Sequence, residues 1–147
     1  MEIVIEKARA DETAAILALL AEHTLPLEGL RDHLETAIVA RRGAAVVGVA
    51  ALEVYAGGVL MRSVAVAPAL QGTGVGRRLT DAVLRLAQEI GAPHAYLLTT
   101  TAEGYFPKFG FERIDRADVP ASVQASIEFR SACPASAIVM RKRLSGS

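Results

Sequence analysis

The residues whose types and spacing could do chemistry gather in one short stretch of the chain, from Gln71 to Arg77. Gly72, Gly74 and Gly76 alternate with small residues there, so backbone N–H groups can approach a ligand without side chains in the way. Helical spacing of apolar residues begins directly afterwards, and the first turn of a helix presents unpaired N–H groups and the positive end of its dipole. Such an arrangement binds phosphate. The sequence therefore predicts a phosphorylated ligand.

Two common nucleotide-binding loops do not fit this stretch. A Walker P-loop ends in Gly-Lys-Ser/Thr, whereas Gly76 is followed by Arg77 and Arg78. A dinucleotide fingerprint needs Gly-x-Gly-x-x-Gly at the start of a βαβ unit, and the third glycine here comes one residue early. An ordinary glycine-rich turn between a strand and a helix is the remaining alternative.

Two charged residues, Glu53 and Arg62, lie on predicted apolar strands that precede this stretch. Glu53 and Tyr55 share one face of a predicted strand, and Glu53 either accepts a proton or faces solvent. Arg62 stands in an apolar run, where an unpaired charge is costly. Its planar fork suits a carboxylate, phosphinate or arsinate group. An internal salt bridge, for instance to Glu53, is the alternative.

Composition sets limits on the function. The 147 residues fit one domain, and equal numbers of basic and acidic side chains, 16 each, give no general attraction to nucleic acid. A single cysteine, Cys133, excludes an internal disulfide and a cysteine-only zinc site, and it lacks a local activating base. Because His23, His33 and His94 are dispersed, we expect no metal. We find no signal peptide and no apolar run of about 18 residues, so no membrane partner and a cytoplasmic location are expected.

Hydrophobic periodicity predicts the elements that must position these residues. We expect strands around Ile3 and Ile5, over 37–42, 45–55, 59–67 and 94–100, from Gly110 onward, and over 137–144. We expect helices from an Asp11 cap through Leu20, over 27–34 opened by Pro26, from the glycine loop to Ile90 with a stop at Gly91, from a Thr101 cap through Phe106, and from Pro120 to about Phe129.

The loop belongs to a longer pattern. Gln71, Gly74 and Gly76 form Gln-x-x-Gly-x-Gly, preceded by Val-x-Pro at Val66 and Pro68. This pattern resembles the acetyl-coenzyme A loop of the GNAT superfamily of N-acetyltransferases. The order of predicted elements is similar to that family's over nearly the whole chain.

A second local match lies downstream of the loop. In the run from Phe106 to Phe111 an aromatic residue precedes a Gly-Phe pair, which resembles the family's corner between a helix and a strand. The resemblance implies an α/β (α+β) class with the GNAT fold, 1–147 forming a single N-acetyltransferase domain. Its central sheet would be mixed and mostly antiparallel, with about six or seven strands flanked by helices and splayed at the central parallel strand pair. The pantetheine arm of the cofactor would lie in that gap.

The resemblance also implies roles for particular residues. Backbone amides would hold the pyrophosphate and face the acetyl carbonyl; the candidates for binding the co-substrate, acetyl-CoA, are Val64, Ala65, Val66, Gln71, Gly72, Thr73, Gly74, Val75, Gly76 and Arg77. Glu53 would be the base that takes the amine's proton. Many members of the family have a tyrosine acid where Phe106 stands. Phe106 has no hydroxyl, so the acid would be its neighbour Tyr105, which points about 100° away on a helix, or solvent.

Several cations suggest a small acidic acceptor for the acetyl group. The candidate substrate residues are Arg62, Arg31 and Thr99. Arg31 is included because it lies with His33 where the family usually builds its acceptor pocket. Arg130 can approach from the late helix.

The run from Tyr96 to Ala102 resembles two groups within the family. These are the short N-acetyltransferases linked to arsenic resistance and the acetyltransferase part of N-acetylglutamate synthases, and the run from Phe129 to Ala137 favours the first. The implied reaction is direct acetyl transfer to the amine of a small amino acid or glutamate-like compound, by a monomer or homodimer. Acetylation of protein or peptide N-termini and non-catalytic acyl-CoA binding are the alternatives.

Overall fold

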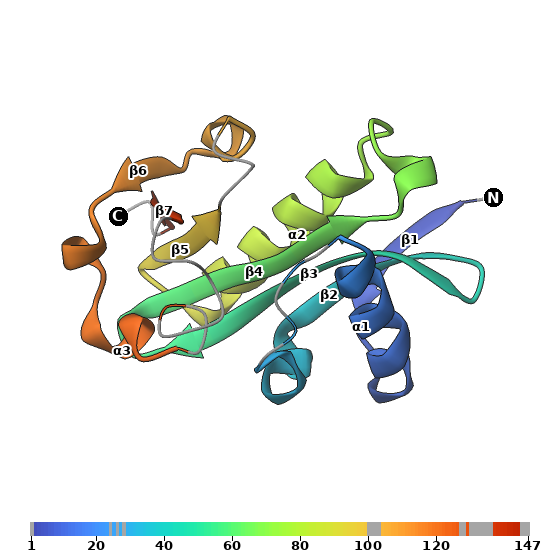
Figure 1. The fold of residues 1–147 in the computed structure, drawn as a ribbon, viewed down its shortest axis with the longest axis horizontal. Coiled ribbons are helices and arrows are strands. Elements are labelled where there is room, and N and C mark those ends of the chain that lie inside the picture. Colours follow the sequence, from blue (N-terminus) through green and yellow to red (C-terminus); the bar gives the residue numbers. More distant parts are fainter. Residues whose placement is uncertain are drawn as a thin grey trace.

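The computed structural model of the protein describes residues 2–23, 25, 27, 29–99, 104–126, 129 and 137–144. Its strands form one seven-stranded sheet in the order β1-β2-β3-β4-β5-β7-β6 (Figure 1). The β4–β5 pair is parallel and the other neighbouring pairs are antiparallel. The strands are β1 (Ile3–Lys7), β2 (Ala37–Arg42), β3 (Ala45–Tyr55), β4 (Gly58–Val66), β5 (His94–Thr99), β6 (Glu112–Ile114) and β7 (Ile138–Arg143). This mixed, mostly antiparallel sheet confirms the fold class expected from the sequence.

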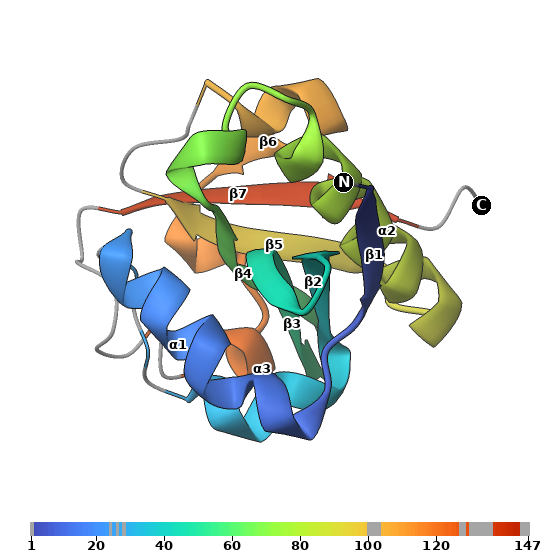
Figure 2. The same ribbon diagram turned by 90° about the vertical axis from the view of Figure 1, so that its right-hand side faces the viewer.

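Helices cover both faces of the sheet. The α-helices are α1 (Thr13–Glu22), α2 (Val75–Ile90) and α3 (Ala121–Gln124), and the short 3-10 helices are η1 (Ala10–Glu12), η2 (Leu30–Thr36), η3 (Pro68–Leu70), η4 (Phe106–Phe109) and η5 (Arg116–Asp118). α1 lies on one side of the sheet and α2 on the other (Figure 2). None of the helices in the described part of the chain is long and apolar enough to cross a membrane.

The core alternates along the strands as the pleat requires. On β2, Ile38 and Ala40 pack in the cluster that includes α2, whereas Ala37 and Val39 pack in the cluster that includes α1. Successive side chains of a strand point to opposite faces, so a strand covered on both faces must be apolar throughout. This explains why the central strands read as continuous hydrophobic runs.

The first helix does not begin at the residue predicted for its cap. Glu12, not Asp11, precedes α1, and its carboxylate accepts the backbone N–H of Arg9 at 2.8 Å. Arg41 also donates to this carboxylate, from Nε at 2.6 Å and from Nη2 at 2.9 Å. The hydrogen bond from Arg41 holds the pKa of Glu12 below its ordinary value, against the opposing effect of burial. The predicted Asp11 cap is therefore wrong, and the first turn of α1 has no side-chain cap, because the Glu12 carboxylate is engaged by Arg9 and Arg41.

Three shorter helices also differ from the prediction. The predicted helix over 27–34 is the 3-10 helix η2, which follows Gly29 in a left-handed conformation (φ 80°). The expected helix through Phe106 is the 3-10 helix η4, which starts at that residue. The late helix is α-helical only over α3 among the described residues. The expected openings at Pro26 and Thr101 lie outside the described residues.

The sheet divides where β4 and β5 separate. These strands pair only at Val59–Ala95 and Leu60–Tyr96 (Figure 1). Just beyond, Ser63 is the one non-glycine residue with positive φ (61°) in the described part of the chain. In the register with β3, Ala51 faces Arg62 but Val49 faces Ala65, so β4 carries an extra residue. Such a bulge bends and twists its strand, and it coincides with the opening of the gap.

Candidate active site

Two glycines of the loop are required by backbone conformation. Gly72 and Gly74 have φ values of 81° and 91°, in the left-handed region that other residues enter only at a cost. A Cβ atom built on either glycine meets nothing within 4 Å, so conformation and not space demands glycine there. Gly76 differs, because its Cβ would lie 3.4 Å from the hydroxyl of Tyr105 and 3.5 Å from Val66.

The loop leads into an uncapped helix. Gly74 is the N-cap residue of α2, so no side chain caps the first turn, and that turn contains no acidic residue. The N–H groups and the positive end of the dipole of this 16-residue helix are therefore available to an anion. A predicted phosphate site requires such a helix start, because its unpaired N–H groups can bind an anion.

A cleft of about 730 Å³ joins this loop to the gap between β4 and β5. One wall is β4 from Met61 to Val66 with the loop, and the other is the end of β5 with the segment from Tyr105 to Phe109. Eight of the residues predicted to bind the co-substrate line it, namely Val64, Ala65, Val66, Gln71, Gly72, Gly74, Gly76 and Arg77. Thr73 and Val75 do not. Thr73 donates its hydroxyl to the carbonyl oxygen of Leu70, and Val75 is buried in the core.

Backbone groups of β4 face the gap. Ala67 donates its N–H to the carbonyl oxygen of Val47 on β3, at 2.8 Å. Successive residues of a strand point their backbone polar groups to opposite neighbours, so the polar groups of Val66 point away from β3. The parallel pairing with β5 ended at Leu60. The N–H of Val66 is therefore directed toward the cleft, as the sequence prediction for this strand requires.

His23 was not singled out by the sequence, yet it borders the cleft at the end of α1. Its Nε2 lies 2.8 Å from the carbonyl oxygen of Val66, and its Nδ1 lies 2.9 Å from that of Leu19. Gln71 donates from Nε2 to the same carbonyl of Val66 at 3.2 Å. His23 and Gln71 thus tie the end of α1 to the end of β4. No local motif could have revealed this, because the contact joins segments 43 residues apart.

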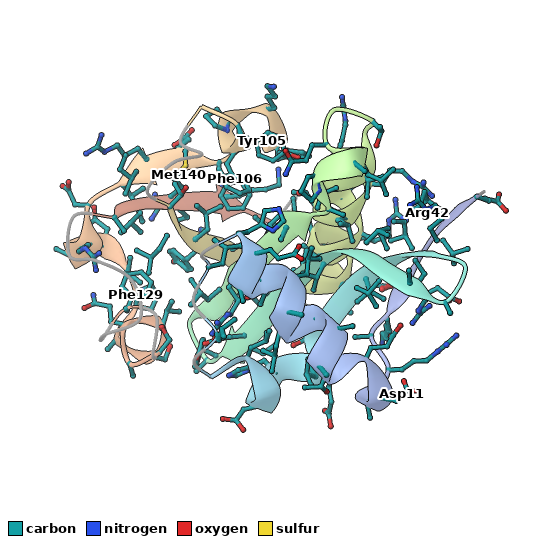
Figure 3. All side chains as sticks on the ribbon, turned by 45° about the vertical axis from the view of Figure 1, so that its right-hand side comes forward. Asp11, Arg42, Tyr105, Phe106, Phe129 and Met140 are labelled. Atoms are coloured by element: carbon teal, nitrogen blue, oxygen red, sulfur yellow. The ribbon has the colours of Figure 1, made fainter. Side chains whose placement is uncertain are left out.

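Tyr105 and Phe106 lie together near the end of α2 that carries the loop (Figure 3). Their rings meet edge to face with centroids 5.2 Å apart, and both residues line the cleft. Phe106 is buried against Phe111, whereas the hydroxyl of Tyr105 comes close to Gly76. Tyr105 and Phe106 point in different directions, as expected for adjacent residues, but both border the cleft. A hydroxyl is present at the cleft despite Phe106.

Glu53 and Arg62 form a buried ion pair. Nη1 of Arg62 donates to Oε2 of Glu53 at 2.7 Å, and the exposed fractions are 3% and 1%. The Tyr55 hydroxyl donates to the other carboxylate oxygen, and Nε2 of His33 lies 3.8 Å from it. Nε of Arg62 donates to Oγ of Ser63 at 3.0 Å. The structure therefore contains the internal salt bridge that the sequence left as the alternative for Arg62.

The two residues of this ion pair, Arg62 and Glu53, differ in their relation to the cleft. Arg62 lines the cleft, together with Thr99 at the end of β5, but Glu53 does not. Both oxygens of Glu53 are engaged, one by the Tyr55 hydroxyl and the other by the Arg62 guanidinium. Among the described residues that line the cleft there is no carboxylate. The side chain of Arg31, and the whole of Arg130 and Cys133, lie outside the described part.

Comparison with known families identifies the class to which this fold and cleft belong. The family model described as an acetyltransferase (GNAT) domain matches residues 33–113, more than half of the chain. The chain therefore belongs to the GNAT acetyltransferase domain family. The matched region runs from η2 through the loop and α2 to the start of β6, so it contains every element that borders the cleft except α1.

Individual relatives agree with this assignment. An amino-acid acetyltransferase from Mycobacterium tuberculosis is 35% identical over 63 residues, which are 43% of this chain and 36% of that protein. N-acetylglutamate synthase from Neisseria gonorrhoeae, complexed with coenzyme A and N-acetyl-glutamate, superposes with a TM-score of 0.83 at 23% identity, over 99% of this chain and 36% of that one. Rv2747 from Mycobacterium tuberculosis, in complex with CoA, gives 0.81 at 26% identity, over 97% of this chain and 99% of that one. The chain thus matches about a third of the length of the first two relatives.

Proposed function

We propose that this chain is an acetyl-CoA-dependent N-acetyltransferase that acts on the amine of a small amino acid or glutamate-like compound. The observation that carries the proposal is the cleft that runs from the gap between β4 and β5 to the uncapped start of α2. A long thioester carrier with a diphosphate fits such a site, because the diphosphate can sit at the helix N-terminus and the acyl arm can enter the gap. Acetyl-CoA supplies the activated acetyl group.

The chain's own groups then have distinct tasks. Backbone N–H groups of the loop, from Gly72 to Arg77, hold the diphosphate. The N–H of Val66 donates toward the acetyl carbonyl oxygen, where donors stabilise developing negative charge. The hydroxyl of Tyr105 is the candidate donor of a proton to the departing thiolate.

The candidate base has a more indirect position. Transfer needs a neutral amine, so a proton must leave the acceptor before or during attack. Glu53 is the predicted base, but it does not line the cleft and both of its oxygens are engaged. It could receive that proton only through a relay such as water. We therefore assign Glu53 first a positioning role, that of fixing the orientation of the buried Arg62 guanidinium.

Arg62 favours an acidic acceptor. Arg62 is among the residues that line the cleft, and Glu53 and Ser63 fix its guanidinium, whose side chain is 0% exposed, just beneath the cleft surface. A fixed guanidinium fork binds a carboxylate, phosphinate or arsinate in defined geometry. The relatives with amino-acid substrates or products in their names support the same class of acceptor. We include toxic glutamate mimics, with a connection to arsenic resistance, in this acceptor class.

A thiol-release assay tests the proposal. The full chain is incubated with acetyl-CoA and a panel of free amino acids that includes glutamate and a phosphinate analogue, and acetylated products are identified by mass spectrometry. Turnover with an acidic amino acid and little turnover with its neutral amide is the expected result. Gly74→Glu should abolish CoA binding in calorimetry, because it puts a negative charge and a strained backbone where the diphosphate sits.

Three results would overturn parts of the proposal. Wild-type CoA affinity in Gly74→Glu would contradict the assignment of the loop. Acetylation of intact proteins without turnover of any free amine would favour action on protein N-termini. Tight CoA binding with no transfer to any amine would favour a non-catalytic module.

The setting of the reaction is part of the proposal. We place the protein in the cytoplasm, where acetyl-CoA is available, as one transferase domain in a monomer or homodimer with no metal requirement. Cell fractionation, sedimentation and assay in the presence of a chelator test these statements separately.

A further inference from the structure

A second groove of about 550 Å³ adjoins the cleft, on the outer side of the α2 start. The two cavities share Arg77, Lys108 and Phe109, so they are continuous at the surface. α2 contributes Arg77, Asp81 and Arg85, which are four residues apart and therefore lie on one helix face. A ligand held at the loop could extend into this groove without crossing another element.

The charged side chains of the groove are mostly positive. Arg77, Arg85, Lys108 and Lys142 line it and come from α2, η4 and β7, while Asp81 is its one carboxylate among the described residues. Segments distant in sequence thus bring like charges together. Like charges at close range repel, so this grouping is more favourable with an anion between the side chains than without one.

Lys142 places its ammonium group close to the backbone of Gly110, and both residues line the groove. A Cβ atom built on Gly110 would lie 2.6 Å from Nζ of Lys142, and Gly110 has a φ of 93°. The glycine therefore leaves room for the ammonium group directly above the corner between η4 and β6. On the neighbouring side, Nζ of Lys108 lies 5.6 Å from the centre of the Tyr105 ring. Lysine ammonium groups from two elements thus flank the end of the cleft.

We propose that this groove binds the 3′-phosphate of coenzyme A and so distinguishes CoA from its 3′-dephospho form. The inference rests on the proposed function. Coenzyme A carries phosphate at two places, a diphosphate in mid-chain and a monophosphate on the ribose. The loop N–H groups take the diphosphate, and the groove next to the loop takes the monophosphate, which bears about −1.5 to −2 charge at neutral pH. Arg77 stands between the two sites and contacts both anions.

Calorimetric titration of the full chain with CoA and with 3′-dephospho-CoA tests the inference. We expect 3′-dephospho-CoA to bind about tenfold more weakly, which corresponds to about 1.4 kcal/mol. Most of these cations are exposed, so the difference should shrink at about 1 M salt, where the Debye length falls to about 3 Å. Affinity for 3′-dephospho-CoA should depend less on salt.

Substitutions in the groove should affect only the phosphorylated form. Arg85→Gln and Lys142→Gln should each weaken CoA binding several-fold and leave 3′-dephospho-CoA unchanged. Asp81→Asn should strengthen CoA binding, because it removes the one repulsive charge. The matched control is Arg78→Gln. Arg78 is also exposed on α2, but it donates to the carbonyl oxygen of Ile3 and does not line the groove.

The outcomes separate this inference from the proposed function. Equal affinity of the wild-type chain for both compounds would overturn the inference and leave the transferase assignment intact. A parallel loss of both affinities in Arg85→Gln and Lys142→Gln would also overturn it, since it would indicate a structural role. Failure to bind either compound would remove the proposed function itself.

Discussion

Replacing Glu53 by glutamine should harm folding and acceptor binding before it harms the chemical step. The change keeps the shape of the side chain but leaves the buried Arg62 guanidinium without its counter-charge, 2.7 Å away. Removing one partner of a buried ion pair costs about 3–5 kcal/mol. Ser63 and Tyr55 keep hydrogen-bonding groups in place, so we expect the lower end of that range. A loss of about 3 kcal/mol lowers the melting temperature by about 6–12 °C in a chain of this size.

A double-mutant cycle measures the pair directly. Glu53→Gln, Arg62→Met and the double variant are unfolded with urea and compared with the wild-type chain. The double variant should be more stable than either single variant, because it buries no unpaired charge. In the thiol-release assay, Glu53→Gln should raise KM for an acidic acceptor with a smaller effect on kcat. A base would show the opposite result, a lower kcat and loss of the acidic limb of the pH profile.

Two results would refute this reasoning. The first is a Glu53→Gln chain whose unfolding free energy stays within about 0.5 kcal/mol of the wild-type value, which is typical of an ordinary surface site. The second is strict additivity of the two single variants in the cycle, since contacting charges must couple. Either result would mean that Glu53 does not hold Arg62 in solution.

Further predictions concern the loop, the cleft and the first helix. Gly74→Ala should destabilise the chain by about 1–2 kcal/mol, the cost of the left-handed conformation, and weaken CoA binding in calorimetry. Tyr105→Phe should lower kcat by about 100-fold if its hydroxyl is the proton donor, with KM unchanged; an unaltered kcat would leave this proton to solvent. Arg41 lowers the pKa of Glu12 from 4.5, so this pair stabilises the fold above that pH, and the contribution is lost as the pH falls through the folded-state pKa. Thermal unfolding of Glu12→Gln should therefore differ most from the wild-type chain at neutral pH and converge with it in acid.

The parts of the fold that depend on local sequence could be predicted. Alternation and turn residues gave the bounds of β2 and β3 to the residue, and the helix after the loop ends at Gly91 as expected. The glycine loop was identifiable because positive φ values at Gly72 and Gly74 leave few alternatives to glycine. The anion site proposed there depends on backbone groups of the loop and of the start of α2, so no distant contact was needed to predict it.

The parts of the fold and of the site that depend on strand register and on distant contacts could not be predicted from the sequence. The register between β3 and β4 decides which residue pairs with Arg62. β4 carries a bulge near Ser63, and no residue type in the sequence predicts it. Glu12 and not Asp11 precedes the first helix, and its carboxylate binds Arg41, which is 29 residues away in the chain. The place of the Tyr105 hydroxyl depends on how the residue that precedes η4 packs near Gly76 at the start of α2, which is a contact between distant segments.

The brief pairing of β4 with β5 has a consequence for cooperativity. The sheet has two parts, one formed by β1 to β4 and the other by β5, β7 and β6. Only two residue pairs, both between β4 and β5, join these parts in the described structure, and elsewhere side-chain packing holds them together. A molecule bound in the gap would contact both parts of the sheet and connect them. Binding of the co-substrate should therefore slow amide hydrogen exchange in both parts of the sheet together, because the bound molecule couples their local stabilities.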